Sequence, residues 1–404
     1  MCRWFDSAPG HQRIKQLAQP LRLGFLLCGI GVGFRRFPLL TVALCQRRRR
    51  AGCLQFGARE SDRASDKLKY AMPPTLNCPS AISEDSFHRF LHLREQVRHL
   101  VDDHLVLECA ALKFVDPLGL CLLHHWFSEL KDRNVHIDLR SLHFSIESYA
   151  VRMDLFKHFE NVTYTDRTSG NGRSHLIGNL VELQAVTSLR DIGAVASQLA
   201  GAVVHGIPDI SFKPDADMMH EPEGTHMVVN LEYVFSEILQ NALDHGRKRG
   251  SSYSQATIAA QYYATKKRLS IAIVDNGCGL FQTLQSHPRM ENIMTDLQAI
   301  KTALEPGVSC NLDLDLGLDS KNQGIGLTVS SRMALAANGR CTVFSGDGGL
   351  RSIKTARPVE LKIPVWQGTG VCFEFDRGAM LKMDKGAVIR ALPGFREEKN
   401  IVFS

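Results

Sequence analysis

The stretch from Leu231 to Gly246, LEYVFSEILQNALDHG, constrains the fold more than any other part of the sequence. Helical spacing gathers its apolar side chains on one face: Leu231, Phe235, Ile238, Leu239 and Ala242. Glu237, Asn241 and Asp244 follow the same spacing on the opposite face. The stretch therefore predicts a helix that is buried on one side and polar on the other.

Glu237 and Asn241 have the chemistry of a cation-dependent site. A carboxylate can activate a water molecule, and the side-chain oxygen of Asn241 can ligate a hard cation such as Mg²⁺. A solvated helix face is the alternative, and this stretch alone does not decide between the two. The motifs that follow it along the chain favour the site.

A second polar motif follows a predicted strand. Gln255–Tyr263 and Leu269–Val274 are two strand candidates, and the sequence Asp-Asn-Gly-Cys-Gly comes directly after the second. Its Asp275 can accept a hydrogen bond from a flat ligand, while Gly277 and Gly279 let the backbone approach that ligand closely. An ordinary turn has the same composition, so this motif is also ambiguous by itself.

A third motif pairs glycines with the start of a helix. The segment Gln323–Leu327 (QGIGL) opens a predicted helix that runs to about Ala337, and the exposed backbone N–H groups at such a start attract phosphate. Residues 281–323 before it have no strong periodicity, so we expect a lid or disorder there. Strands at Cys341–Ser345 and Val371–Phe375 close this half of the chain, with the sequence Gly-Thr-Gly before the second.

Two other nucleotide-binding folds do not fit these glycines. A Rossmann site needs a strand immediately before the first glycine and a third glycine downstream. Here a long segment precedes Gly324, and Val329 stands in place of the third glycine. The chain has no G-x-x-x-x-G-K-[ST] sequence, which excludes a P-loop.

The order of the motifs resembles the GHKL family, the ATP-binding domain shared by histidine kinases, type II topoisomerases, Hsp90, MutL and the anti-sigma serine kinases. The resemblance covers about half of the chain and extends through ALEPGVS in the predicted lid. It implies a Bergerat-type α/β sandwich, which is a mixed sheet with helices on one face, and it implies ATP and Mg²⁺ as cofactors.

The same resemblance implies a role for each motif residue. Asn241 would hold Mg²⁺ against the phosphates, and Glu237 would be the general base if the chain is catalytic. Asp275 would accept a hydrogen bond from the adenine amino group. The other residues would shape the pocket wall, cradle the phosphates and lie beside the base: Gly277, Gly279, Gly324, Gly326 and Thr369.

The first half of the chain alternates predicted strands and helices. Strands are expected at Leu105–Leu112 and Val135–Leu139, and helices at Pro117–Leu130 and from about Ser145 to Phe159. This order implies a sheet that is covered by helices.

Two runs in this half, LVLECAALKFVDPLGLCLLHHWFSELKDRNVHIDL and SYAVRMDLF, resemble the STAS domain of anti-sigma-factor antagonists. That family carries a phosphorylated serine just after an aspartate at one strand-to-helix turn. Here Asp116 is followed by Pro117, Leu118 and Gly119. The lack of a hydroxyl argues against a phosphorylation switch at this turn and leaves a role in docking partners.

The basic charge of the chain is concentrated in residues 1–71. This head holds 14 Lys and Arg against 4 Asp and Glu, which leaves a net charge of −4 on the remainder of a chain whose total is +6. Its apolar run Leu21–Phe34 is shorter than a bilayer span. We expect the head to be disordered or to precede the true start at Met72, and we predict no direct nucleic-acid contact and no membrane span.

The predicted fold class is a two-domain combination of α/β and α+β architecture. We expect a head (residues 1–71), a STAS-like α/β sandwich (72–168), an ATP-binding domain (180–378) and a C-terminal tail (379–404). The 11 cysteines form no C-x-x-C pair, which favours reduced thiols in a cytoplasmic protein.

We interpret the chain as a Mg-ATP-binding regulatory protein, similar to bacterial proteins that fuse the two modules, whose nucleotide-dependent lid controls docking of a protein partner. Because Glu237 and Asn241 are both present, an anti-sigma-type serine kinase and a slow ATPase are the alternatives. A sensor histidine kinase is rejected, since the only His-Glu pair, His220-Glu221, lies in a predicted loop. The partner would be an antagonist or STAS-type regulator, and analogy also implies a homodimer.

Overall fold

The computed structural model describes residues 73–165, 180–205, 207, 209–213, 222–246, 255–308 and 325–393. The chain divides into two compact units, Met1–Lys69 and Tyr70–Ser404, and all described residues belong to the second. The predictions for residues 1–71 and for Gly324 lie outside the described residues.

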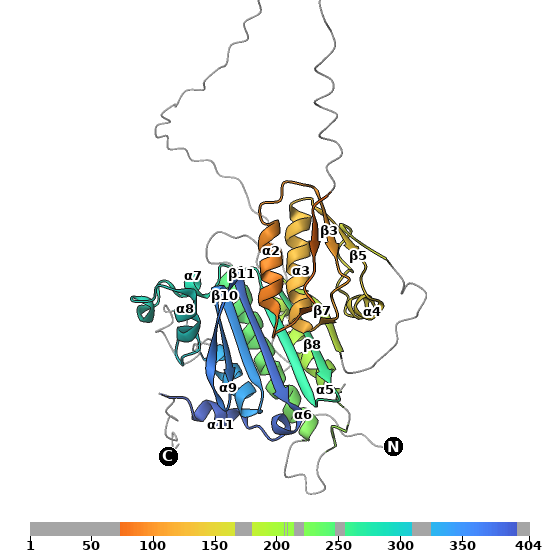
Figure 1. Cartoon of the computed structure of the whole chain (residues 1–404). Coiled ribbons are helices and arrows are strands. Elements are labelled where there is room, and N and C mark those ends of the chain that lie inside the picture. Colours follow the sequence, from red (N-terminus) through yellow and green to blue (C-terminus); the bar gives the residue numbers. More distant parts are fainter. Residues whose placement is uncertain are drawn as a thin grey trace, which may run out of the picture. The chain divides into compact units, whose positions relative to one another are not determined.

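The first half of the described unit contains a four-stranded parallel sheet with the strand order β1-β3-β5-β6 (Figure 1). Its strands are β1 (Thr75–Asn77), β3 (His104–Glu108), β5 (His136–Arg140) and β6 (Val162–Tyr164). A short parallel pair lies beside it, formed by β2 (Ala81–Ile82) and β4 (Phe114–Val115). The helices of this half are α2 (Phe87–Val97), α3 (Pro117–Asp132) and α4 (Phe144–Arg152).

The second half contains a five-stranded antiparallel sheet with the strand order β10-β11-β9-β8-β7. Its strands are β7 (Leu180–Val186), β8 (Ala256–Tyr263), β9 (Arg268–Asp275), β10 (Arg340–Ile353) and β11 (Ala356–Asp376). The helices are α5 (Ile192–His205), α6 (Glu223–Gly246), α7 (Leu280–Leu284), α8 (Asp296–Ala303), α9 (Gly326–Ala336), α10 (Arg377–Leu381) and α11 (Lys385–Arg390). Two short 3₁₀ helices complete it, η2 (Leu189–Asp191) and η3 (Pro288–Met290).

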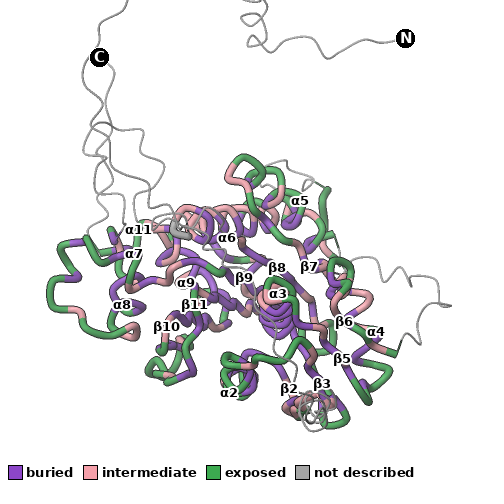
Figure 2. Tube along the Cα trace, turned by 90° about the horizontal axis from the view of Figure 1, so that it is seen from above, coloured by how far each residue is buried: buried purple, intermediate pink, exposed green. Residues whose placement is uncertain are grey.

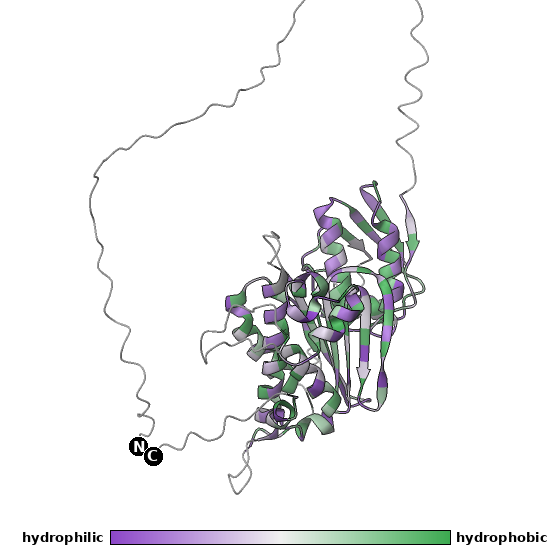
Figure 3. Cartoon of the chain, turned by 90° about the vertical axis from the view of Figure 1, so that its left-hand side faces the viewer, coloured by the Kyte–Doolittle hydropathy of each residue, from purple (hydrophilic) through white to green (hydrophobic). Residues whose placement is uncertain are grey.

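The five-stranded sheet is covered on both faces. Along β9, Ile271 and Ile273 face a core built with α5, α6 and α9, whereas Ala272 and Val274 face a core shared with α2 and α3. This is the period of two that a strand imposes on its side chains. Because both faces are buried, the strand is an almost continuous apolar run rather than an alternating one, and Figure 3 shows such stretches in green.

Helix α3 lies between the two sheets, which explains why its side chains are buried on nearly all sides (Figure 2). Pro117 occupies its first turn, and the Asp116 side chain caps it by accepting a hydrogen bond from the Gly119 N–H at 2.8 Å. On one side Cys121 packs against β9, with its thiol 3.7 Å from the Ala272 carbonyl oxygen. The small Ala272 side chain lets the helix approach the sheet closely.

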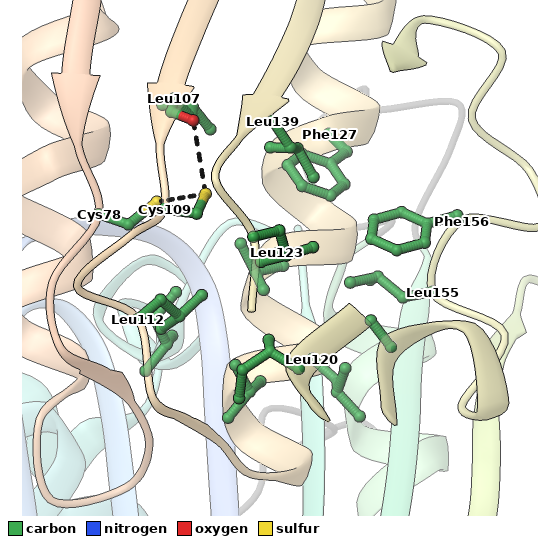
Figure 4. Close-up of a pocket in the computed structure, with 15 residues that line it drawn as sticks. Cys78, Leu107, Cys109, Leu112, Leu120, Leu123, Phe127, Leu139, Leu155 and Phe156 are labelled. Atoms are coloured by element: carbon green, nitrogen blue, oxygen red, sulfur yellow. Dashed lines mark hydrogen bonds between the residues drawn. The ribbon is translucent and has the colours of Figure 1, made fainter. Parts of the chain in front are cut away.

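On its other side α3 contributes to an apolar cavity of about 30 Å³ inside the first half. Figure 4 shows Leu120, Leu123 and Phe127 from α3 on this cavity. Cys78 and Cys109 also line it, with their sulfur atoms 3.4 Å apart. The hydrogen bond with Cys78, together with burial, raises the pKa of the Cys109 thiol, which keeps it protonated and part of the apolar core.

The predicted combination of α/β and α+β architecture is confirmed, since the described residues form parallel and antiparallel sheets packed with helices. The mixed sheet expected in the second half is wrong, because all described strand pairs of that sheet are antiparallel. Its second face is covered by α2 and α3 of the first half. The predicted helix from Leu231 forms but begins already at Glu223. The predicted strand to Leu112 ends at Glu108, and the helix expected to reach Phe159 ends at Arg152. Among the described residues, no helix is both long enough and apolar enough to cross a bilayer.

Of the two expectations for residues 281–323, disorder is wrong for the part that the structure describes, while the lid stays a prediction. Helices α7 and α8 lie in this segment, with η3 between them. Thr295 and Gln298 form a capping box at the start of α8, in which the threonine side chain accepts from the Gln298 N–H at 3.2 Å. These helices are too short to give a clear periodicity, whereas the capping box was visible in the sequence.

Candidate functional site

Asp275 is the last residue of β9, and its carboxylate is buried. Its Oδ1 accepts hydrogen bonds from the N–H of Gly277 at 2.8 Å and from the N–H of Thr369 at 3.1 Å. Burial raises the pKa of Asp275 to about 7, although both backbone hydrogen bonds act in the opposite direction. The structure thus joins three of the predicted site residues around one carboxylate.

The backbone around Asp275 requires glycine at two positions. Gly279 has φ = 81° and Gly368 has φ = 112°, and a Cβ on Gly368 would lie 2.2 Å from the Asp275 carbonyl oxygen. Ser345 ties these segments together, because its hydroxyl donates to the Gly368 carbonyl at 2.9 Å and accepts from the Leu280 N–H at 2.9 Å. The end of β9, the start of α7 and β11 are therefore fixed to one another.

Glu237 and Gly326 form a second cluster. Gly326 opens α9, and a Cβ on it would lie only 2.1 Å from Oε2 of Glu237. The carboxylate of Glu237 thus lies against the N-terminus of α9. Burial raises its pKa, and the positive charge of Lys385 partly opposes that shift. Asn241 is half-buried one turn further along α6.

The donor set tests whether Mg²⁺ fits. Among the described residues, no group of three or more His, Cys, Asp and Glu side chains could hold a metal ion by itself. The Asn241 amide oxygen is a single ligand for an octahedral cation. It suits Mg²⁺ that is bound together with phosphate oxygens and water, which is how this ion is commonly held beside nucleotides.

The two clusters belong to neighbouring elements. Helix α6, which carries Glu237 and Asn241, packs against both α9 and β9. Gly279 joins the Asp275 cluster through Ser345. Gly324 lies outside the described residues, so its predicted role stays a prediction.

Several residues beside these clusters were missed by the sequence reasoning. Ser345 and Trp366 carry no motif, although Trp366 lies just before the Gly-Thr-Gly sequence of β11. Lys385 belongs to α11, in the segment expected to be a tail, and its Nζ lies 4.7 Å from the ring centre of Tyr233. These contacts join positions far apart in the chain, and no local pattern marks them.

Comparisons with known proteins give limited matches. Neither the protein-family models nor the curated proteins match the chain. Among solved structures, the chain is similar to two crystal structures of the ATPase region of Saccharomyces cerevisiae topoisomerase II. One of these structures is bound to ICRF-187 (dexrazoxane). Both show 14% identity over 44% of this chain and 46% of that chain, with TM-scores of 0.26 and 0.25. The chain thus spans less than half the length of these neighbours, and scores this low carry no argument about its function.

Proposed function

We propose that this chain binds Mg-ATP and that Asp275 recognises the adenine amino group. The observation that supports this best is the buried Asp275 carboxylate, whose Oδ1 is oriented by the N–H groups of Gly277 and Thr369. A buried carboxylate is costly unless it is hydrogen-bonded, and a neutral amino group of a ligand is a suitable further donor. The proposal also rests on the order of motifs that resembles the GHKL family.

The phosphates would lie at the N-terminus of α9. The helix dipole favours an anion at this end, and the Glu237 carboxylate lies against Gly326 there, so the phosphates would lie beside that carboxylate. Asn241 would hold Mg²⁺ together with phosphate oxygens. When bound, this ion neutralises charge on the phosphates.

We further propose that nucleotide binding controls the docking of a protein partner. A cleft of about 400 Å³ lies beside Gly279, the last residue of the Asp-Asn-Gly-Cys-Gly motif. Phe281 and Asp296 of the predicted lid also line it, together with Arg94 and Arg98 of α2. The cleft therefore borders both the proposed adenine loop and the STAS-like first half. A shift of α7 and α8 on nucleotide binding would change a surface that both halves share.

The decisive experiment is a titration with labelled ATP, with and without Mg²⁺. Wild type should bind saturably and more tightly with Mg²⁺. Asp275→Asn keeps an oxygen that can accept from the Gly277 and Thr369 N–H groups, but it has lost the carboxylate, so its binding should weaken by about tenfold or more. Absence of saturable binding by wild type would overturn the proposal.

A serine kinase or a slow ATPase is the second candidate, and Glu237 favours it. A carboxylate with a raised pKa beside the proposed phosphate position is suited to act as a general base. Replacing Glu237 by Gln distinguishes an enzyme from a purely regulatory ATP-binding module. An enzyme would lose phosphate transfer or hydrolysis while it still binds ATP, whereas a purely regulatory module would show no turnover in either form and would keep partner binding.

A further inference from the structure

The first half of the chain reaches the proposed adenine site through one buried histidine. His125 of α3 is 6% exposed, and its Nε2 lies 2.9 Å from the carbonyl oxygen of Val274, the residue before Asp275. The hydroxyl of Thr257 donates to the same carbonyl at 3.3 Å. The peptide group between Val274 and Asp275 is therefore held by hydrogen bonds on the sheet face that packs on α3, opposite to α6.

The geometry fixes the protonation of this histidine. A carbonyl oxygen only accepts, so Nε2 of His125 carries the hydrogen and donates it. Burial lowers the pKa of His125 to about 4, so the ring is neutral at physiological pH. The contact is thus a neutral hydrogen bond inside an apolar core, and it gives the Val274 carbonyl a second side-chain donor beside the Thr257 hydroxyl.

Trp366 makes the matching contact to the next carbonyl. Its indole N–H donates to the carbonyl oxygen of Asp275 at 3.2 Å. Its ring packs edge-to-face on His125, with ring centres 5.9 Å apart, and Arg94 of α2 lies over it at 5.1 Å. Two consecutive carbonyls at the end of β9 therefore accept from side chains. His125 of the first half donates to Val274, and Trp366 of β11, which packs on first-half residues, donates to Asp275.

We propose that His125 and Trp366 are positioning residues that set nucleobase selectivity. They fix the peptide units on either side of the Cα of Asp275, and so aim its carboxylate at a base that carries an exocyclic amino group. The STAS-like half thereby takes part in base recognition without touching the nucleotide. This inference rests on the proposed ATP binding.

The test compares ATP with inosine triphosphate, which has the same triphosphate but a carbonyl in place of the amino group. Dissociation constants for both nucleotides are measured on the full chain with Mg²⁺. Wild type should prefer ATP. His125→Phe and Trp366→Phe remove one donor each and keep an aromatic ring, so each should weaken ATP binding by about tenfold and leave binding of inosine triphosphate nearly unchanged.

Two further variants separate positioning from general stability. His125→Gln keeps an N–H donor and should restore most of the ATP preference. Trp126→Phe alters a tryptophan that is buried in the same core but packs on Phe90 at 5.4 Å, so it should lower the thermal midpoint without changing the ratio of the two constants. Should His125→Phe fail to fold, Trp366→Phe carries the test.

Each outcome has a distinct meaning. If wild type binds neither nucleotide, the proposed function fails. If wild type binds both equally, or if His125→Phe and Trp366→Phe keep the wild-type ratio, nucleotide binding stands and the positioning role is wrong. The role is also wrong if Trp126→Phe reduces the ratio as much as Trp366→Phe does.

Discussion

At the scale of single residues, the buried carboxylate of Asp275 lowers the stability of the fold and is also the proposed adenine contact. Burial of its carboxylate raises its pKa, and the backbone hydrogen bonds from Gly277 and Thr369 oppose that shift only in part. A carboxyl group ionises near 3.9 in an unfolded chain and at about 7 here. Between these values the folded state binds more protons than the unfolded state, so this group lowers stability as pH rises from about 4 to about 7.

Asp275→Asn should therefore stabilise the protein at pH 8 and give no gain near pH 4. The amide oxygen can still accept from the Gly277 and Thr369 N–H groups, while the buried charge is gone. The measurement is the thermal midpoint of both forms across this pH range, and the difference should reach a few degrees at pH 8. A difference that stays constant with pH would show that the carboxylate is not strained by burial.

At the scale of helices, the two glycines Gly326 and Gly201 offer a matched pair. A Cβ on Gly326 would meet the Glu237 side chain at 2.1 Å, whereas a Cβ on Gly201, inside α5, would meet nothing within 4 Å. Gly326→Ala should cost about 1–3 kcal/mol of unfolding free energy, because Glu237 or α9 must move. Gly201→Ala should instead stabilise by about 0.5–1 kcal/mol, since alanine favours a helix interior.

Denaturant unfolding checks both values. ATP titration adds a second readout, because Gly326→Ala should also weaken ATP binding while Gly201→Ala should not. Equal effects of the two substitutions on stability would mean that Glu237 does not lie against α9 as described.

The elements that the sequence predicted well have local signals. Helix α3 starts at Asp116-Pro117, a cap followed by a proline, and β9 is an apolar run that ends at Asp275. Strand β10 was expected to end at Ser345 but continues to Ile353, with register shifts around Gly346. Pairing with β11 carries the strand on past its glycines.

The candidate site was predictable only in part, for a similar reason. Glu237, Asp275 and Gly326 lie in short motifs whose order along the chain is informative. His125 and Ser345 act through contacts between segments far apart in the sequence, and a buried histidine in an apolar helix reads as ordinary core. The sequence therefore predicted the motif residues of the proposed site, while the structure was needed to reveal what holds Asp275 in place.

At the scale of the whole described unit, a buried carboxylate joins the two halves. Glu84, which lies just before α2, is 3% exposed. Its Oε2 lies 2.9 Å from Nε of Arg340, its Oε1 accepts from the Thr342 hydroxyl at 2.6 Å, and Arg351 donates to its backbone carbonyl. Together with the shared core of α2, α3 and the five-stranded sheet, this network couples the folding of the halves.

We accordingly expect residues 73–393 to unfold in one cooperative transition, and Glu84→Ala to lower its free energy by about 3–5 kcal/mol, because Arg340 loses a buried carboxylate partner and the Thr342 hydroxyl loses its acceptor. Glu360→Ala is the control. It removes an exposed pair with Lys301 and should cost about 1 kcal/mol or less. Far-ultraviolet circular dichroism and tryptophan fluorescence should give the same midpoint, since Trp126 and Trp366 report on the two halves. Separate midpoints in wild type would show that the first half folds independently, and would remove the basis for treating it as part of the nucleotide site.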